Sequence, residues 1–234
     1  MNFTSQIFDA MKFTLRDWKA IIILGIILCI ASTSEEIYAN DLIISLILFI
    51  ISVLLLFIEE GYRYKIIKET IQGNNNPPAI RNFLNLIKEG FLETVTLAIF
   101  ITIVECIQKL NEIILPIFDS SGISQIIFAI LAIIIYLTFF GATIYKAQQG
   151  GKFLSAFNII GILRLYYKIG ILETIFLIIL GSISFNLIYS CVFNLGIFET
   201  KHFIDFITSF FINPIILLFI TRLMASCGRE ANPS

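Results

Sequence analysis

The composition of the chain argues against a water-soluble protein. Its 234 residues are 58% hydrophobic and only 14% charged, whereas a soluble domain has about 45–50% apolar and about 25% charged residues. Sixteen Lys and Arg against 17 Asp and Glu leave a net charge of −1, which argues against nucleic acid as a partner. We therefore expect an integral membrane protein whose main partner is the lipid bilayer.

Six apolar runs are candidates for membrane-spanning helices. A span needs about 20 mainly apolar residues, because each residue advances a helix by about 1.5 Å across a hydrocarbon core about 30 Å thick. The runs are continuous and lack the alternation of a barrel strand, so they predict helices. In chain order they are Trp18–Ser34, Leu42–Ile58, Phe91–Ile107, Ile123–Tyr145, Ile169–Val192 and Phe203–Met224. A cleaved signal peptide is the alternative for the first run, but Asp9 and Asp17 before it favour an uncleaved helix.

The basic residues are divided unevenly between the two sides of the predicted bundle. Lys109 and Lys201 fall on one side, and the other fourteen fall on the opposite side. Because Lys and Arg accumulate in cytoplasmic loops, we expect a multi-pass protein of the cell membrane with both termini in the cytoplasm. The fourteen are Lys12, Arg16, Lys19, Arg63, Lys65, Lys68, Arg81, Lys88, Lys146, Lys152, Arg164, Lys168, Arg222 and Arg229.

An internal repeat is visible in the sequence. The stretch Lys88–Thr94 matches Lys168–Thr174 at five of seven positions, and the two copies have the same direction because two predicted helices separate them. The stretches before the first, third and fifth runs also alternate apolar and basic residues at helical spacing, which is typical of helices in the membrane interface. We predict one domain over residues 1–234 with repeat units of approximately 1–73, 74–150 and 151–234. Its fold class is an all-α integral membrane protein with six transmembrane helices in three pseudo-repeated hairpins, each preceded by an interfacial amphipathic helix.

Several turn and interface residues carry a family resemblance. Arg16-Asp17-Trp18 precedes the first run, Gly61-Tyr62-Arg63 closes the second, and Gly73, Pro77-Pro78, Phe83 and Gly90 lead into the third. With these residues the chain resembles an uncharacterised archaeal membrane family, catalogued as domain of unknown function 4013. The resemblance covers most of the chain, although the second half lacks a proline pair. It implies a multi-span membrane protein and supplies no known activity, cofactor or catalytic residue.

Glu93 and Glu173 are candidate functional residues because they occupy equivalent positions of the repeat. A carboxylate inside a bundle costs about 2.5–3.5 kcal/mol on the insertion scale and can carry protons or bind a cation. The alternative is structural, since each Glu follows a glycine by three residues. At that depth it would lie in the headgroup zone and favour the positive end of a starting helix.

The remaining polar positions have structural and functional interpretations. Pro214, after Asn213, predicts a kink or break in the sixth helix, and broken helices line binding sites in transporters. Asn186 favours an interhelical hydrogen bond over substrate binding. Cys29, Cys106 and Cys191 are expected toward the outer leaflet, where a disulfide between two of them is an alternative to free thiols. No cysteine spacing or histidine cluster indicates a metal site, and no catalytic motif or cofactor site is found.

The sequence therefore favours a non-enzymatic scaffold or a component of a membrane complex, with another membrane protein or a second copy of the chain as its protein partner. The alternative is a transporter of small solutes or lipids that uses the repeat interface, with Glu93, Glu173, Asn186 and the break at Pro214 as its site. An intramembrane enzyme is the third hypothesis.

Overall fold

The chain folds into helices throughout the part that can be described. The computed structural model describes residues 3–16, 18–36, 42–114, 130, 138–170, 173–177 and 207–231. Within these ranges every regular element is a helix and no strand occurs, which confirms the all-α class. The elements are α1 (Phe3–Arg16), α2 (Trp18–Glu36), α3 (Leu42–Ile71), α4 (Phe83–Ile114), the 3-10 helix η2 (Phe153–Phe157), α6 (Ile159–Ile169), the π-helix η3 (Thr208–Ile212) and α9 (Asn213–Glu230). Residues 138–148 and 173–177 are also helical.

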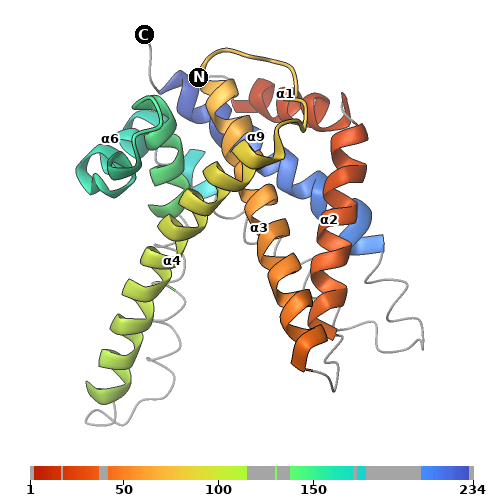
Figure 1. Cartoon of the computed structure of the whole chain (residues 1–234). Coiled ribbons are helices and arrows are strands. Elements are labelled where there is room, and N and C mark those ends of the chain that lie inside the picture. Colours follow the sequence, from red (N-terminus) through yellow and green to blue (C-terminus); the bar gives the residue numbers. More distant parts are fainter. Residues whose placement is uncertain are drawn as a thin grey trace, which may run out of the picture.

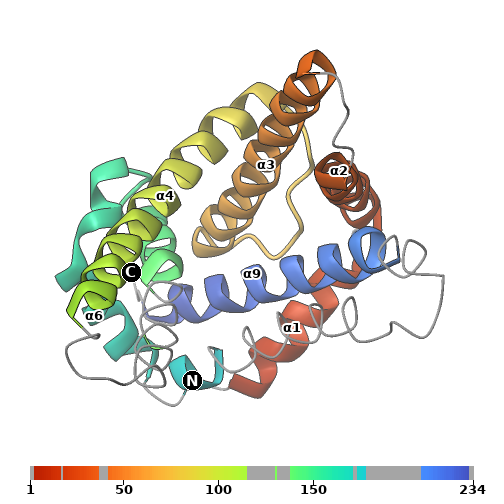
Figure 2. The same cartoon turned by 90° about the horizontal axis from the view of Figure 1, so that it is seen from below.

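The long helices share one end of the molecule. Figure 1 shows that α3 ends and α4 begins at a common end, from which the two helices diverge, with α2 beside α3. At the common end lie α1, α6 and one end of α9. Figure 2, seen from below, shows α1 and α9 side by side. This end contains most of the buried side chains that are described below.

The crossing of α3 and α4 depends on two glycines. A Cβ at Gly61 would overlap the carbonyl oxygen of Leu86, and a Cβ at Gly90 would overlap that of Phe57. The two backbones therefore approach closely, as small residues allow between packed helices. A related contact recurs 80 residues later, where a Cβ at Gly141 would overlap the side chain of Tyr166.

The last helix is irregular near its proline. The π-helix η3 leads directly into α9, and Pro214 is buried near the start of α9. A proline removes a backbone donor, and π-turns are one way in which a helix accommodates the loss. A π-helical turn therefore lies directly before Pro214, whereas the kink or break that the sequence predicts there stays a prediction.

Two of the three predicted interfacial helices are separate elements, and one is not. α1 precedes α2, and η2 with α6 precedes the helical residues 173–177. Before the third predicted span, residues 77–82 have no regular structure and α4 then runs without interruption from Phe83 to Ile114. The interfacial stretch is thus the first part of α4, because no glycine or proline after Phe83 ends the helix until Gly90, and Gly90 is accommodated within the helix by the close crossing.

The structure does not support the number of six spans, which stays a prediction. In the described part of the chain one helix, Phe210–Glu230, is long and apolar enough to cross a membrane. α3 combines the apolar residues 42–58 with a polar end, and α4 has Glu93 and Glu105 within its apolar run. Most of the predicted spans Ile123–Tyr145 and Ile169–Val192 lies outside the described residues.

Candidate functional site

A buried ion pair joins α4 to the helical residues 138–148. The carboxylate of Glu93 accepts a hydrogen bond from the ammonium group of Lys146, and the two side chains are only 1% and 2% exposed. Thr143, one turn before Lys146, donates its hydroxyl hydrogen to the other carboxylate oxygen at 3.0 Å. Both oxygens of Glu93 are thus hydrogen-bonded, as a buried charge requires.

Aromatic side chains enclose the ammonium group. Lys146 Nζ lies 4.5 Å from the ring centroid of Tyr64 and 5.9 Å from that of Phe153, which places a cation over two ring faces. The phenol oxygen of Tyr64 is buried and has no hydrogen-bond partner among the described residues. Burial raises the pKa of the Tyr64 phenol, and the charges of Glu93 and Glu89 add to the rise. The Tyr64 hydroxyl is therefore a neutral, unused hydrogen-bonding group.

A second ion pair lies beside the first. Arg63 Nη1 donates to Glu60 Oε1 at 2.5 Å, and the Arg63 guanidinium lies over the ring of Phe140 at 5.1 Å. A small cavity of about 10 Å³, lined by these residues with Tyr64, Glu93 and Thr143, separates the two pairs. That volume is about what one water molecule needs. We name this group of residues, Glu60, Arg63, Tyr64, Glu93, Thr143 and Lys146, the charged cluster.

Glu59 borders the charged cluster on α3, just after the predicted second span. Burial raises the pKa of Glu59 to about 7, with the neighbouring charge of Glu60 adding to the rise and that of Arg63 opposing it. The carboxyl group of Glu59 thus titrates near neutral pH, in contrast to an exposed glutamate.

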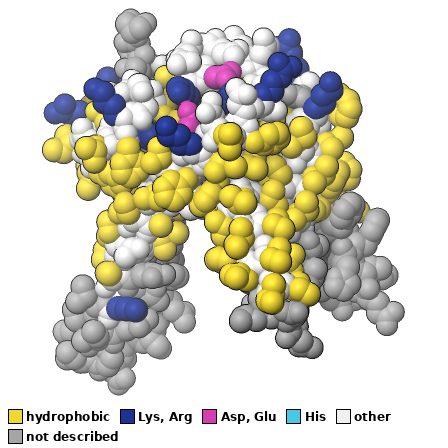
Figure 3. Space-filling view, viewed as in Figure 1, with side chains coloured by type: hydrophobic (Ala, Val, Ile, Leu, Met, Phe, Trp, Pro, Cys, Tyr) yellow, Lys and Arg dark blue, Asp and Glu magenta, His cyan; other side chains and the backbone are white. Residues whose placement is uncertain are grey.

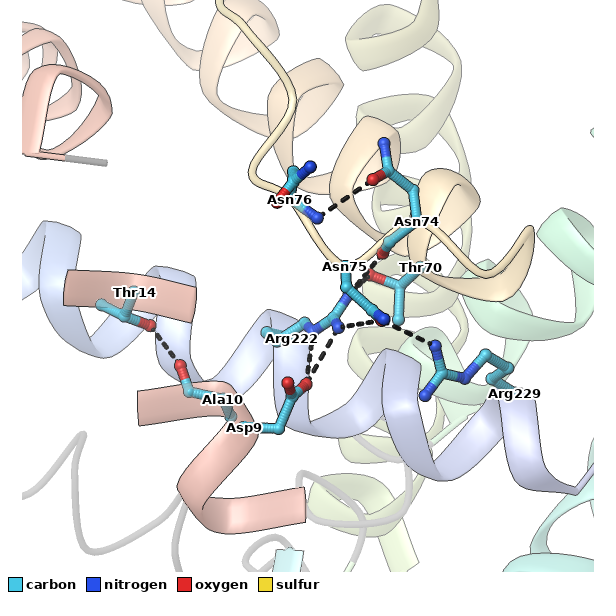
Figure 4. A network of polar contacts seen from close by, with 9 residues as sticks. All are labelled: Asp9, Ala10, Thr14, Thr70, Asn74, Asn75, Asn76, Arg222 and Arg229. Atoms are coloured by element: carbon cyan, nitrogen blue, oxygen red, sulfur yellow. Dashed lines mark hydrogen bonds and ion pairs between the residues drawn. The ribbon is translucent and has the colours of Figure 1, made fainter. Parts of the chain in front are cut away.

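A separate polar network fixes the loop between α3 and α4 (Figure 4). Arg222 of α9 is fully buried and donates to Asp9 Oδ2 of α1 at 2.9 and 3.1 Å. It also donates to the hydroxyl of Thr70 at 2.8 Å, the carbonyl of Asn74 at 2.9 Å and the side-chain oxygen of Asn75 at 3.1 Å. One guanidinium therefore connects α9, α1, the end of α3 and the loop that follows it, using the fixed geometry of its donors.

The surface divides into a basic end and apolar helices. Figure 3 shows most of the visible Lys and Arg side chains at the common end, with hydrophobic side chains over the parts of the helices that extend away from it. On α3 the exposed apolar residues include Ile43, Ile47, Ile50 and Leu54, which recur at helical spacing. Such a continuous exposed apolar face is unusual for a soluble protein and indicates contact with lipid or with another apolar surface.

α1 is divided lengthwise into three faces. One face, formed by Gln6, Ala10, Phe13 and Thr14, is buried against the protein. The predicted apolar residues Phe8, Met11 and Leu15 lie instead on an exposed face, at 68%, 53% and 59% exposure. Lys12 and Arg16 lie between these faces and are exposed. The apolar stripe of this helix therefore does not contribute to the protein core.

α6 is divided in the same way. Its buried face contains Ile162, Leu165 and Ile169. Ile160, Leu163 and Tyr167 form an exposed apolar face at 65%, 62% and 81% exposure, and Arg164 and Lys168 are exposed beside it. Around both helices the apolar, basic and buried faces follow one another in the same rotational order.

The candidate residues from the sequence have different surroundings. Glu93 lies beyond the second turn of α4, which begins at Phe83, so it is not at the start of a helix. Glu173 is half-buried, and its carboxylate lies against Gly170, where the backbone leads into residues 173–177. The repeat therefore places the two carboxylates in unlike environments, one paired in the interior and one at the start of a helix.

The structure describes only some of the other candidate residues. Asn213 is half-buried next to Pro214, and its side-chain oxygen has no hydrogen-bond partner among the described residues. Asn186 lies outside the described residues. Cys29 and Cys106 form no disulfide with a residue that the structure describes, and Cys191 lies outside the described residues. Among the residues that the structure describes, no group of three or more His, Cys, Asp or Glu side chains is arranged to hold a metal ion.

Sequence reasoning missed two residues that are central to these networks. Lys146 and Arg222 were interpreted only as basic residues on the cytoplasmic side. For Arg222 a signal was present, because a charged side chain inside the apolar run Phe203–Met224 requires a partner. For Lys146 the signal was weaker, since it directly follows its apolar run and its partner is 53 residues away.

Comparison with known proteins finds one family. A model of the family described as "Protein of unknown function (DUF4013)" matches residues 44–198, which is more than half of the chain. No curated protein and no solved structure matches the chain.

Proposed function

We propose that this chain, which belongs to the DUF4013 family of proteins of unknown function, is a multi-pass membrane protein that acts as a non-enzymatic scaffold or as a component of a membrane complex. The archaeal source that the family resemblance implies is part of the same proposal. So are the count of six spans, the three repeated hairpins and the cytoplasmic location of both termini.

The exposed apolar face of α3 is the main support for a membrane location. A side chain such as Ile43, 68% exposed, or Phe49, 65% exposed, loses roughly 1.5–3 kcal/mol when it stays in water instead of an apolar environment. Many such residues line α3 and α4 over lengths of 30 and 32 residues. A hydrocarbon surround removes this penalty, and the basic common end then lies at the headgroups.

The contacts between Gly141 and Tyr166 and between Gly61 and Leu86 support the repeat. In both cases a glycine near the end of one helix packs against a residue of the next interfacial stretch, and both members are shifted by 80 residues. The three-faced helices α1 and α6 support an interfacial location, because an exposed apolar stripe beside a basic face suits the boundary between headgroups and acyl chains.

The fully hydrogen-bonded polar groups support a scaffold role. Glu93 and Arg222 each have hydrogen bonds to neighbouring elements, so they connect helices. Buried polar groups with all partners present tend to fix one helix arrangement. Helices that are connected by such contacts suit a component that other membrane proteins bind.

Labelling of single cysteines tests this proposal. In a chain whose four cysteines are replaced by serine, Asn2→Cys and Ser234→Cys report the termini, and Asn40→Cys and Ser121→Cys report the predicted outer loops. A membrane-impermeant maleimide applied to intact cells should label only the two loop positions, and all four after permeabilisation. Labelling of one terminus from outside contradicts the even number of spans, and a chain that is monodisperse without detergent contradicts the membrane location.

The charged cluster favours transport as the second candidate function. The unpartnered hydroxyl of Tyr64 borders the cavity beside Glu93 and Thr143, an arrangement that could hold a water for proton transfer. Tyr64→Phe removes this hydroxyl without breaking the ion pair, so folding should be retained. Loss of a pH-dependent flux in proteoliposomes with Tyr64→Phe and with folded Glu93→Gln supports transport through the charged cluster. An unchanged flux with both variants contradicts that site, and absence of a flux with the native chain supports the scaffold.

A further inference from the structure

Two basic pairs at the common end have no counter-ion in the described structure. Lys12 and Arg16 are one turn apart on α1, and Arg164 and Lys168 are one turn apart on α6. All four side chains are exposed, and none has an ion pair with any residue that the structure describes. Like charges at this spacing repel each other, so an anion between them would be favourable.

Both pairs have exposed apolar neighbours at the same spacing. Each cation follows directly after an exposed apolar residue, in the order Met11-Lys12 and Leu15-Arg16 on α1 and Leu163-Arg164 and Tyr167-Lys168 on α6. On each helix two apolar side chains therefore lie beside two cations along one edge. The helix dipole explains a cation in the last turn of a helix, but it does not explain the second cation one turn earlier or the exposed apolar partners.

The first pair also has space beside it. Lys12, Leu15 and Arg16 line a wide, open hollow on the surface. Its described lining combines two cations with one apolar side chain. A phosphate group between the cations and an acyl chain along Leu15 would match both parts of that surface.

We propose that α1 and α6 each bind the headgroup of an anionic phospholipid, the phosphate between the paired cations and the acyl chain along the neighbouring apolar stripe. This inference rests on the proposed membrane location and adds the class of lipid and the residues that recognise it. Paired sites on two repeat units would give the basic end a shell of anionic lipid. Each cation near an anionic surface is worth roughly fivefold in partitioning.

The only tryptophan of the chain reports on the α1 site. Trp18 is exposed and follows Arg16 by two residues. The full chain is reconstituted in phosphatidylcholine vesicles that contain a minor fraction of either brominated phosphatidylglycerol or equally brominated phosphatidylcholine, and quenching of Trp18 fluorescence is measured. We expect the ratio of quenching by the anionic lipid to quenching by the neutral lipid to exceed one, and to fall to about one in Lys12→Gln/Arg16→Gln and in high salt.

A matched variant separates a local site from general attraction. Arg81→Gln/Lys88→Gln removes the same charge from another exposed basic stretch and should leave the ratio unchanged. For α6, Trp18→Phe/Tyr167→Trp moves the reporter, and Arg164→Gln/Lys168→Gln should abolish the preference there.

Three results would contradict the lipid sites or the membrane location. Equal quenching by the two lipids overturns the site on the helix that is being probed. An equal fall of the ratio with Arg81→Gln/Lys88→Gln also overturns it, because the preference would then be a general effect of charge. Absence of quenching by either lipid indicates instead that the proposed membrane location is wrong.

Discussion

Replacing one member of the Glu93–Lys146 pair should destabilise the fold strongly. Glu93→Gln preserves the side-chain volume and an acceptor for Thr143 but leaves the ammonium of Lys146 with no carboxylate at 2% exposure. Removing one partner of a buried pair costs about 3–5 kcal/mol, because the remaining charge stays desolvated. For a chain of this size each kcal/mol corresponds to about 2–4 °C in Tm, so the expected fall is roughly 6–20 °C.

Removing both charges should restore most of this loss. Lys146→Met alone leaves the Glu93 carboxylate with Thr143 as its hydrogen-bond partner, and should cost as much as Glu93→Gln. In Glu93→Gln/Lys146→Met no uncompensated charge remains, and exchanging a buried pair for neutral residues is often neutral. Thermal unfolding in detergent gives the coupling free energy from a double-mutant cycle, with the exposed Lys88→Gln as a surface control. The reasoning is refuted if a single variant stays within about 1 kcal/mol of the native chain, or if the double variant loses the sum of the two.

Three further predictions concern the same end of the molecule. Gly90→Ala should separate α3 from α4 and lower the free energy of unfolding by about 1–3 kcal/mol. As a control, the Cβ of Gly73→Ala meets open space at a positive φ, so this variant should lose about 1–2 kcal/mol through backbone strain alone. Crosslinking measures the tilt between the two helices, and an equal tilt in both variants would contradict the close crossing. Arg222→Lys should expose the loop after α3 to proteases as strongly as Arg222→Gln does, because an ammonium cannot replace the guanidinium fork. Asp9→Asn, at a half-exposed position, should have a smaller effect. Protection of the loop in Arg222→Lys would refute the assigned role of Arg222. Burial raises the pKa of Glu59 to about 7, so the folded state binds more protons than the unfolded state between about pH 4.5 and 7. The free energy of unfolding should therefore fall as the pH rises through this range. Glu59→Gln should remove this part of the pH dependence in thermal unfolding, and an unchanged slope would show that Glu59 does not titrate there.

Part of the fold follows from local patterns. Long continuous apolar runs predict helices, and the structure contains helices over the first three of them. Pro77-Pro78 and the preceding Gly73 predict a break, and α3 does end at Ile71 with no helix before Phe83. The Asn213-Pro214 pair predicts an irregular helix, and η3 ends at that point. These features depend on backbone properties of a few neighbouring residues, which the sequence states directly.

The extent of the interfacial helices could be predicted only partly. The alternation of apolar and basic residues identifies α1. In the third unit it covers Phe153–Ile160, which form η2 and only the start of α6. It also does not show that α4 continues through Gly90. A glycine favours a helix boundary when its surroundings are unknown. In the fold Gly90 lies inside α4. A glycine is needed at this position because α3 approaches too closely for any side chain.

The sequence by itself determined the helical class, the breaks between helices and the family, because each of these depends on composition or on residues close together in the chain. The tertiary structure alone decided which charges meet. Glu93 and Glu173 occupy equivalent positions, yet among the described residues only Glu93 of the two has an ion pair with a lysine, which lies 53 residues further along the chain. Arg222 reaches Asp9 across 213 residues. A buried charge must have a partner, but packing selects the partner, and packing is a property of the whole chain.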